Sequence, residues 1–307
     1  MRIAVLFGAG ASFGSGNVNP YPPPLGSDLY VDLAENFPQS WGSLPSEIVE
    51  VFVNKQFEEA MVAICATHQD RVQRLLIDMT IYFSRFRAGA TQSDCYSQLL
   101  DVLTTTRLCR STGIATLNYE CVFDEIMARA GRSPTYVAPE PTACQSVLWK
   151  LHGACNLLPR SDDINIRHST IVSFSNSYYE GRVEVCCLDR IGHKYAGGYS
   201  LPAAMSLFAK GKHTPVAPSF VGTARDQWAQ WVKRSEVSII IGAHPNHGDE
   251  HVWNPIIEGG SKVWYVGGTE GGDYPEIADQ LSSRLTVLGR TFLEALPSLL
   301  RRLRIIA

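Results

Sequence analysis

The sequence predicts an α/β fold in which a doubly wound parallel sheet is covered by helices on both faces. Short apolar, β-branched runs alternate with longer stretches of helical periodicity, which is the pattern of repeated strand–helix units. The runs are continuously apolar, as expected of strands buried on both sides. A segment rich in glycine directly follows the first run, as in folds that bind ligands beyond the carboxyl ends of their strands.

Five apolar runs are predicted to form the sheet. The first lies at the N-terminus and has too few apolar residues for a signal peptide, which favours a buried strand. The others follow at intervals long enough for a crossover connection between parallel strands. The predicted strands are Arg2–Phe7, Gly113–Leu117, Val147–Leu151, Val237–Ile241 and Lys262–Val266.

Helical spacing of apolar residues predicts helices in the intervals. These are Glu47–Ala66, Arg71–Arg85, Ser97–Leu108, Cys121–Ala130, Asp226–Arg234 and Phe292–Leu303. The proline-rich segment Asn17–Leu25 is predicted to be an ordered loop, because proline suits neither a helix interior nor a central strand. We therefore expect a single domain over residues 1–307, with a helical insertion at about 28–110. A second insertion, at about 159–220, has a mixed composition that favours no element.

Composition limits the possible partners. The chain has 307 residues, of which 45% are apolar, and a net charge of −3. It can therefore bury a large core, but it lacks the basic surface that nucleic acid or an anionic membrane requires. No run approaches the roughly 18 apolar residues of a membrane span. The 8 cysteines form no C-x-x-C pair, which predicts cytosolic thiols, a cytoplasmic location and no zinc ribbon.

The segment Gly8-Ala9-Gly10-Ala11-Ser12 is a candidate phosphate loop. Glycines after a first strand let the backbone approach a diphosphate, and the following helix can supply N–H donors. The usual dinucleotide fingerprint has a third glycine five residues after the first, and Phe13 stands there instead. Taken alone, the segment fits a plain tight turn equally well.

Other strand ends carry small or polar residues as well. Asn118-Tyr119-Glu120 follows the second predicted strand, and His152-Gly153 follows the third. Gly242-Ala243-His244 and Gly267-Gly268 follow the last two. The carboxyl ends of strands in an open parallel sheet form the ligand crevice, so we expect one site at this edge.

Several segments resemble a known family. They are GAGAS at 8–12, PPLGSDL at 23–29, FEEAM at 57–61, ATLNYE at 115–120, KLHGACN at 150–156 and IIIGAHPNHGDEHV at 239–252. Together they resemble the bacterial sirtuin-like (silent-information-regulator-like) domain of antiviral defence NAD hydrolases, in the branch that lacks the zinc ribbon. The resemblance covers about 1–158 and 220–268 and implies a Rossmann-like, sirtuin-type fold. The chain departs from the family at Glu120, where an aspartate is usual, and at Gly242-Ala243-His244, where a Gly-Tyr-Ser type turn is usual.

The resemblance implies that NAD is the substrate and that the nicotinamide–ribose bond is hydrolysed. It makes Asn118 and His152 the catalytic residues, and imidazole has a suitable pKa for a general base. The Asn118 carboxamide can hold ribose hydroxyls or the attacking water. Asp249 or Glu120 is a candidate contact of the adenosine ribose, and the proline-rich loop is a candidate lid. The expected cofactor-binding residues are Gly8, Ala9, Gly10, Ala11, Ser12, Leu25, Tyr119, Gly242, Asp249 and Gly267.

These expectations define a leading function and two alternatives. The first is an NAD-depleting effector of antiphage defence, held silent by assembly or by a sensor protein and active as an oligomer or hetero-complex. The alternatives are an NAD-dependent protein deacylase and a non-catalytic NAD- or ADP-ribose-binding regulatory subunit. No metal is expected, because His244, His247 and His251 fit the polar rim of a crevice better than a closed metal site.

Overall fold

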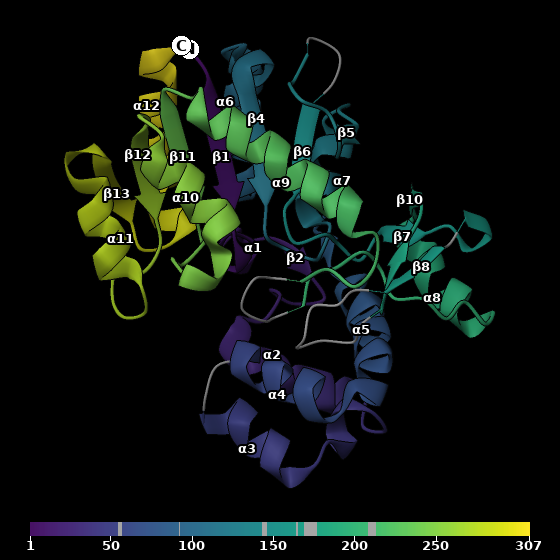
Figure 1. Ribbon diagram of the computed structural model, residues 1–307. Coiled ribbons are helices and arrows are strands. Elements are labelled where there is room, and N and C mark those ends of the chain that lie inside the picture. The colour runs from purple at the N-terminus through teal and green to yellow at the C-terminus, as the bar shows by residue number, and fades with distance from the viewer. Residues whose placement is uncertain (55–56, 92, 143–145, 164, 169–176, 208–212) are drawn as a thin grey trace.

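The computed structural model describes residues 1–54, 57–91, 93–142, 146–163, 165–168, 177–207 and 213–307. Its centre is a seven-stranded sheet in which every neighbouring pair is parallel. The strands are β1 (Ile3–Phe7), β4 (Thr112–Thr116), β5 (Pro134–Thr135), β6 (Ser146–Lys150), β11 (Val237–Ile241), β12 (Lys262–Val266) and β13 (Leu285–Gly289). Their order is β13-β12-β11-β1-β4-β6-β5, which confirms the predicted fold class (Figure 1).

All five predicted strands are present, and β1 lies between β4 and β11. Phe7 at the end of β1 pairs with Thr116 and with Ile241, so the carboxyl ends of these three strands meet. The sequence missed β5 and β13, which are the two edges of the sheet. An edge strand is covered less completely than a central one, and β13 shows this in its partly exposed residues.

Two groups of helices cover the two faces of the sheet. On one face, Leu6 packs in a cluster with Trp228 and Trp253. On the other, the Phe7 ring lies 4.9 Å from the Tyr96 ring and 4.8 Å from the Phe123 ring. The first group is α9 (Pro218–Lys233), α10 (Glu250–Glu258) and α11 (Tyr274–Leu281), and the second is α6 (Cys95–Thr105), α7 (Val122–Arg129) and α12 (Phe292–Ile306).

A helical segment between β1 and β4 lies beyond the carboxyl ends of the strands (Figure 1). It contains α2 (Gly26–Asn36), α3 (Ser46–Asn54), α4 (Phe57–Thr67) and α5 (Gln69–Phe83). The prediction of one helix over Glu47–Ala66 is wrong, because α3 ends at Asn54 and α4 begins at Phe57. The Phe52 ring on α3 and the Phe57 ring on α4 lie 5.1 Å apart.

The remaining elements are short. They are α1 (Ala9–Phe13), α8 (Leu188–Ala196) and the two-stranded pairs β2 (Val18–Asn19) with β3 (Arg87–Ala88), β7 (Leu157–Pro159) with β10 (Val183–Val185), and β8 (Asn165–His168) with β9 (Ser177–Glu180). The proline-rich segment thus contributes only the short β2 strand, outside the main sheet. Within the described ranges, no helix has both the length and the apolarity needed to cross a membrane.

Candidate active site

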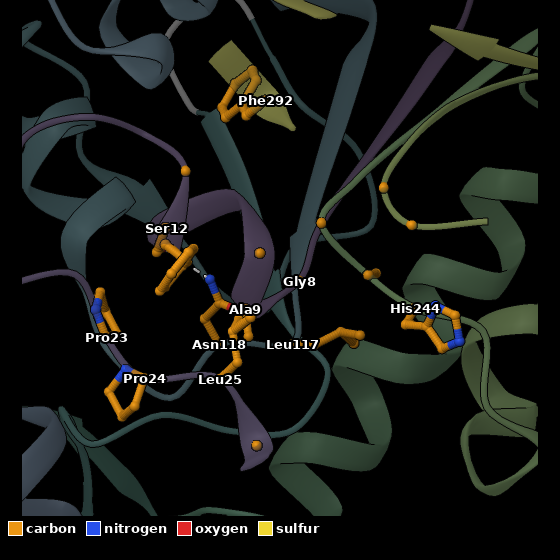
Figure 2. A pocket seen from close by; sticks show the side chains of 18 of the residues that line it. Gly8, Ala9, Ser12, Pro23, Pro24, Leu25, Leu117, Asn118, His244 and Phe292 are labelled. Carbon is orange, nitrogen blue, oxygen red and sulfur yellow. Dashed lines mark hydrogen bonds between the residues drawn. The ribbon is translucent and has the colours of Figure 1, made fainter. Parts of the chain in front are cut away.

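A cavity of about 550 Å³ lies at the carboxyl ends of the strands. The predicted site residues line it, with the exception of Ala11, which is fully buried. Pro23, Pro24 and Leu25 lie on one side of the cavity and His244 on the other, with the loop after β1 and Asn118 between them (Figure 2). The chain thus brings residues from widely separated strand ends, and from the proline-rich segment, to one place.

The loop after β1 is bound to the loop after β11 through its backbone. The Gly8 amide donates to the Ile241 carbonyl at 2.9 Å, and the Gly10 amide donates to the Gly242 carbonyl at 2.9 Å. These two amides hold the two loops together, and the binding of a diphosphate by the small residues of the segment stays a prediction. A Cβ atom on Gly8 would lie 2.5 Å from the Gly242 carbonyl oxygen, so glycine is required there by the contact between the loops.

Gly242 is the most constrained of these glycines. Its φ is +66°, and a Cβ atom would lie 2.1 Å from the Ala11 amide nitrogen. We expect Gly242→Ala to lower the free energy of unfolding by at least about 1–2 kcal/mol, because left-handed backbone and a steric clash both oppose it. Urea unfolding measures this change. The same substitution at Gly222 in α9 meets open space and should raise stability by up to about 1 kcal/mol. If both substitutions changed the free energy of unfolding equally, the backbone at position 242 would not require glycine.

A buried polar network fixes the orientation of Asn118. Its Nδ2 atom donates to Ser12 Oγ at 3.0 Å and to Glu120 Oε1 at 2.9 Å. Ser12 Oγ also donates to Glu120 Oε1 at 2.5 Å, and the Val122 amide donates to Glu120 Oε2 at 2.6 Å. Asn118 lines the cavity, and its buried Oδ1 atom accepts no hydrogen bond from any described residue. A buried acceptor of this kind is expected to bind a ligand donor.

Glu120 should give stability a measurable pH dependence. Burial raises the pKa of its carboxyl group, while Lys150 and the hydrogen bonds act in the opposite direction. In the unfolded chain the pKa is about 4.3, so between that pH and the folded pKa the folded state binds more protons. This contribution to the free energy of unfolding therefore decreases as pH rises through that window. Urea unfolding at a series of pH values should show this decrease in the wild type and not in Glu120→Gln. If the free energy of unfolding fell equally with pH in both proteins, Glu120 would not be its source.

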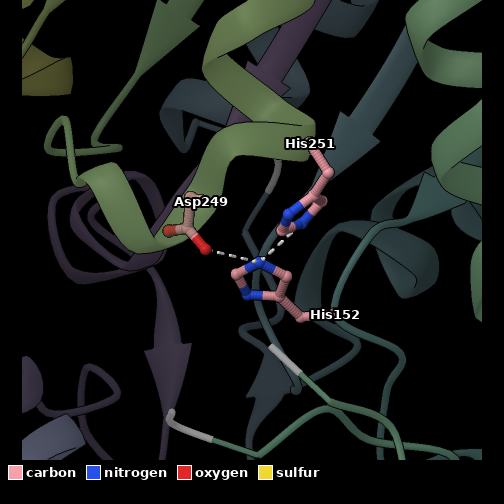
Figure 3. A group of neighbouring side chains, drawn as sticks. All are labelled: His152, Asp249 and His251. Atoms are coloured by element: carbon pink, nitrogen blue, oxygen red, sulfur yellow. Dashed lines mark hydrogen bonds and ion pairs between the residues drawn. The ribbon is translucent and has the colours of Figure 1, made fainter. Parts of the chain in front are cut away.

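His152 lies two residues beyond the end of β6 and is 5% exposed. Its Nε2 atom is 3.2 Å from Asp249 Oδ1 and 3.2 Å from His251 Nε2 (Figure 3). Asp249 directly precedes α10 and lies beside His152. Its contact with the adenosine ribose stays a prediction. His247 points elsewhere, with its Nε2 atom 3.0 Å from Glu276 Oε2.

The sequence missed one acidic residue of the cavity. Glu58 on α4 lines it, and its Oε2 atom accepts a hydrogen bond of 3.0 Å from Asn246 in the loop after β11. The FEEAM segment contains this residue, but only the fold shows that α4 reaches the cavity. Glu120 and Asp249 line the same cavity, so three carboxyl groups border it. Arg290, directly after β13, also lines it.

Two cysteines beside the site are buried thiols. Cys121 Sγ and Cys155 Sγ lie 3.9 Å apart, and Lys150 Nζ lies 4.0 Å from Cys121 Sγ. Burial raises the pKa of Cys121 well above its ordinary value, and the nearby lysine lowers it only in part. A thiol that stays protonated is a poor nucleophile, so Cys121 acts in packing. Cys155 is fully buried beside it and belongs to the same core.

Comparison with known proteins supports the fold assignment. No protein-family model matches the chain, and no curated protein matches it significantly in sequence. A solved structure concerned with the mechanism and regulation of Sir2 enzymes superposes with a TM-score of 0.50, at 12% identity, over 100% of this chain and 94% of that one. The protein has a sirtuin-like fold. A Sir2 variant with a deacetylated p53 peptide and 3′-O-acetyl-ADP-ribose also matches, with a TM-score of 0.45 and 13% identity, over 100% of this chain and 93% of that one.

Proposed function

We propose that the cavity binds NAD and that the protein hydrolyses its nicotinamide–ribose bond to give nicotinamide and ADP-ribose. The observation that carries the proposal is that Asn118 lines the same cavity as His152, and that its buried Oδ1 atom accepts no hydrogen bond from the described residues. An amide oxygen in this position can accept a hydrogen bond from a ribose hydroxyl, while an imidazole on the same wall can accept a proton. The sirtuin-like fold supports the choice of nucleotide.

The order of the strands supports one orientation of NAD. The loop after β1 lies at the centre of the sheet, and its small residues let a diphosphate approach the backbone. Asn118 and His152 follow β4 and β6 on one side of it, which is where the nicotinamide ribose belongs. Gly267 and Arg290 follow β12 and β13 on the other side, which leaves that end for adenosine.

The chemistry requires no general acid. The bond from ribose C1′ to the pyridinium nitrogen breaks, and nicotinamide leaves as a neutral base with the bonding electron pair. The sugar passes through an oxocarbenium-like transition state, which the nearby carboxylates of Glu58 and Asp249 stabilise by charge. The water oxygen forms the new bond to C1′, and its proton passes to the His152 imidazole and then to solvent.

The direct test is to incubate purified protein with NAD and to measure free nicotinamide and ADP-ribose over time. Nicotinamide release without any peptide supports hydrolysis. Release that requires an acyl-lysine peptide and yields the deacylated peptide supports a deacylase, and binding without product supports a regulatory subunit. Because NAD depletion would harm its own cell, we propose that a partner or assembly controls the activity in antiphage defence. The assay is therefore repeated with the products of neighbouring genes.

A further inference from the structure

Three potential metal ligands converge at one end of the cavity. His152 comes from the end of β6, whereas Asp249 and His251 come from the start of α10. One nitrogen or oxygen atom from each lies within 4.8 Å of the other two. Figure 3 shows Asp249 and His251 approaching the same Nε2 atom of His152 from two sides.

Hydrogen bonding alone explains this arrangement poorly. An imidazole Nε2 atom carries either one hydrogen or one lone pair, so it forms one well-directed hydrogen bond. Here a carboxylate oxygen and a second imidazole nitrogen both lie 3.2 Å from it. Two neutral imidazoles and a carboxylate can instead all direct lone pairs at a single cation.

We propose that His152, Asp249 and His251 form a binding site for a divalent transition metal of the Zn²⁺ class. Ligand bonds of about 2.0–2.1 Å in a tetrahedral site place neighbouring ligand atoms roughly 3.3–3.4 Å apart, close to the two separations of 3.2 Å. Two imidazoles favour zinc-like ions over Mg²⁺ or Ca²⁺, which prefer oxygen ligands. His152 and Asp249 both line the cavity, so a fourth ligand can be water.

Occupation of the site has a consequence that rests on the proposed function. A metal bound to Nε2 uses the lone pair with which His152 would accept a proton, so Zn²⁺ should inhibit NAD hydrolysis. Metal binding itself is measured without NAD. A failure of the NAD assay therefore leaves the metal result unaffected, and a failure to bind metal leaves the NAD assay interpretable.

The test uses chelator-treated full-length protein titrated with Co²⁺, whose visible absorption reports coordination, followed by displacement with Zn²⁺. We expect one equivalent bound through nitrogen and oxygen ligands. Loss of a residue that only orients a metal ligand lowers metal affinity by roughly 10- to 100-fold. His251→Ala and Asp249→Asn each remove a ligand, so each should lower the Co²⁺ affinity by more than this. His193→Ala is the matched control, because His193 is exposed on α8 and outside the cavity.

Circular dichroism and urea unfolding confirm that each variant is folded. The proposal is overturned if wild-type protein gives no Co²⁺ absorption. It is equally overturned if both folded ligand variants bind as tightly as the wild type, or if the spectrum shows thiolate-to-cobalt charge transfer, which would place the ion on cysteine.

Discussion

His152→Ala should lower the rate of NAD hydrolysis by about 100- to 10,000-fold, because loss of a general base has effects of that size. The His152 side chain lines the same cavity as Asn118. Nicotinamide release, measured with any required partner present, gives the rate. His152→Gln keeps a side chain of similar size without a titrating imidazole, so it should be similarly inactive.

His152 and Asn118 are both buried, so the stability of each variant must be measured beside its activity. His193→Ala again provides the control, since it removes an exposed imidazole and should retain the wild-type rate. A folded His152→Gln protein that releases nicotinamide at a near-normal rate would exclude His152 as the base.

Lys150→Met should lower the free energy of unfolding by about 3–5 kcal/mol, the usual cost of removing one partner from a buried ion pair. Lys150 is 1% exposed, and its Nζ atom lies 2.6 Å from Asp124 Oδ2. Burial is the largest influence on the pKa of Lys150 and lowers it, but Asp124, Cys121 and Glu120 together outweigh burial, so the pKa is raised. The substitution leaves the Asp124 carboxylate with the Tyr136 hydroxyl at 2.7 Å and without its cation. Urea unfolding gives the change.

An exposed pair on the same chain is the control. Lys233 Nζ lies 3.0 Å from Glu258 Oε2, but the two side chains are 54% and 58% exposed. Lys233→Met should therefore cost no more than about 1 kcal/mol. Combining Lys150→Met with Asp124→Leu removes both buried charges and should recover much of the lost stability. If Lys150→Met and Lys233→Met had the same effect, the buried pair would not hold this part of the fold together.

The central strands could be predicted because they are buried on both sides, and each therefore leaves a continuous apolar run. The edge strands β5 and β13 could not, because partial exposure makes their composition resemble that of loops. The break between α3 and α4 was also hidden, because both helices direct apolar residues to the same core.

Much of the candidate site followed from the rule that the carboxyl ends of parallel strands meet. The rule did not predict the partners of His152. Asp249 and His251 lie beside it because α10 begins at this point of the fold, which the sequence does not show. The glycine pattern after the first strand also matched the dinucleotide-binding fingerprint only in part. The chain has Phe13 where the fingerprint has its third glycine, and that side chain is 50% exposed at the end of a five-residue helix.

The central position of β1 has a consequence for hydrogen exchange. All five of its residues are fully buried, and neighbouring strands pair with it on both sides. Its amide protons should therefore exchange with solvent only when the whole domain unfolds. A ligand that binds only the folded state slows such exchange by an amount set by its concentration and dissociation constant. In the His152→Gln protein, which should bind NAD without consuming it, the β1 amides would therefore report NAD affinity in the absence of turnover.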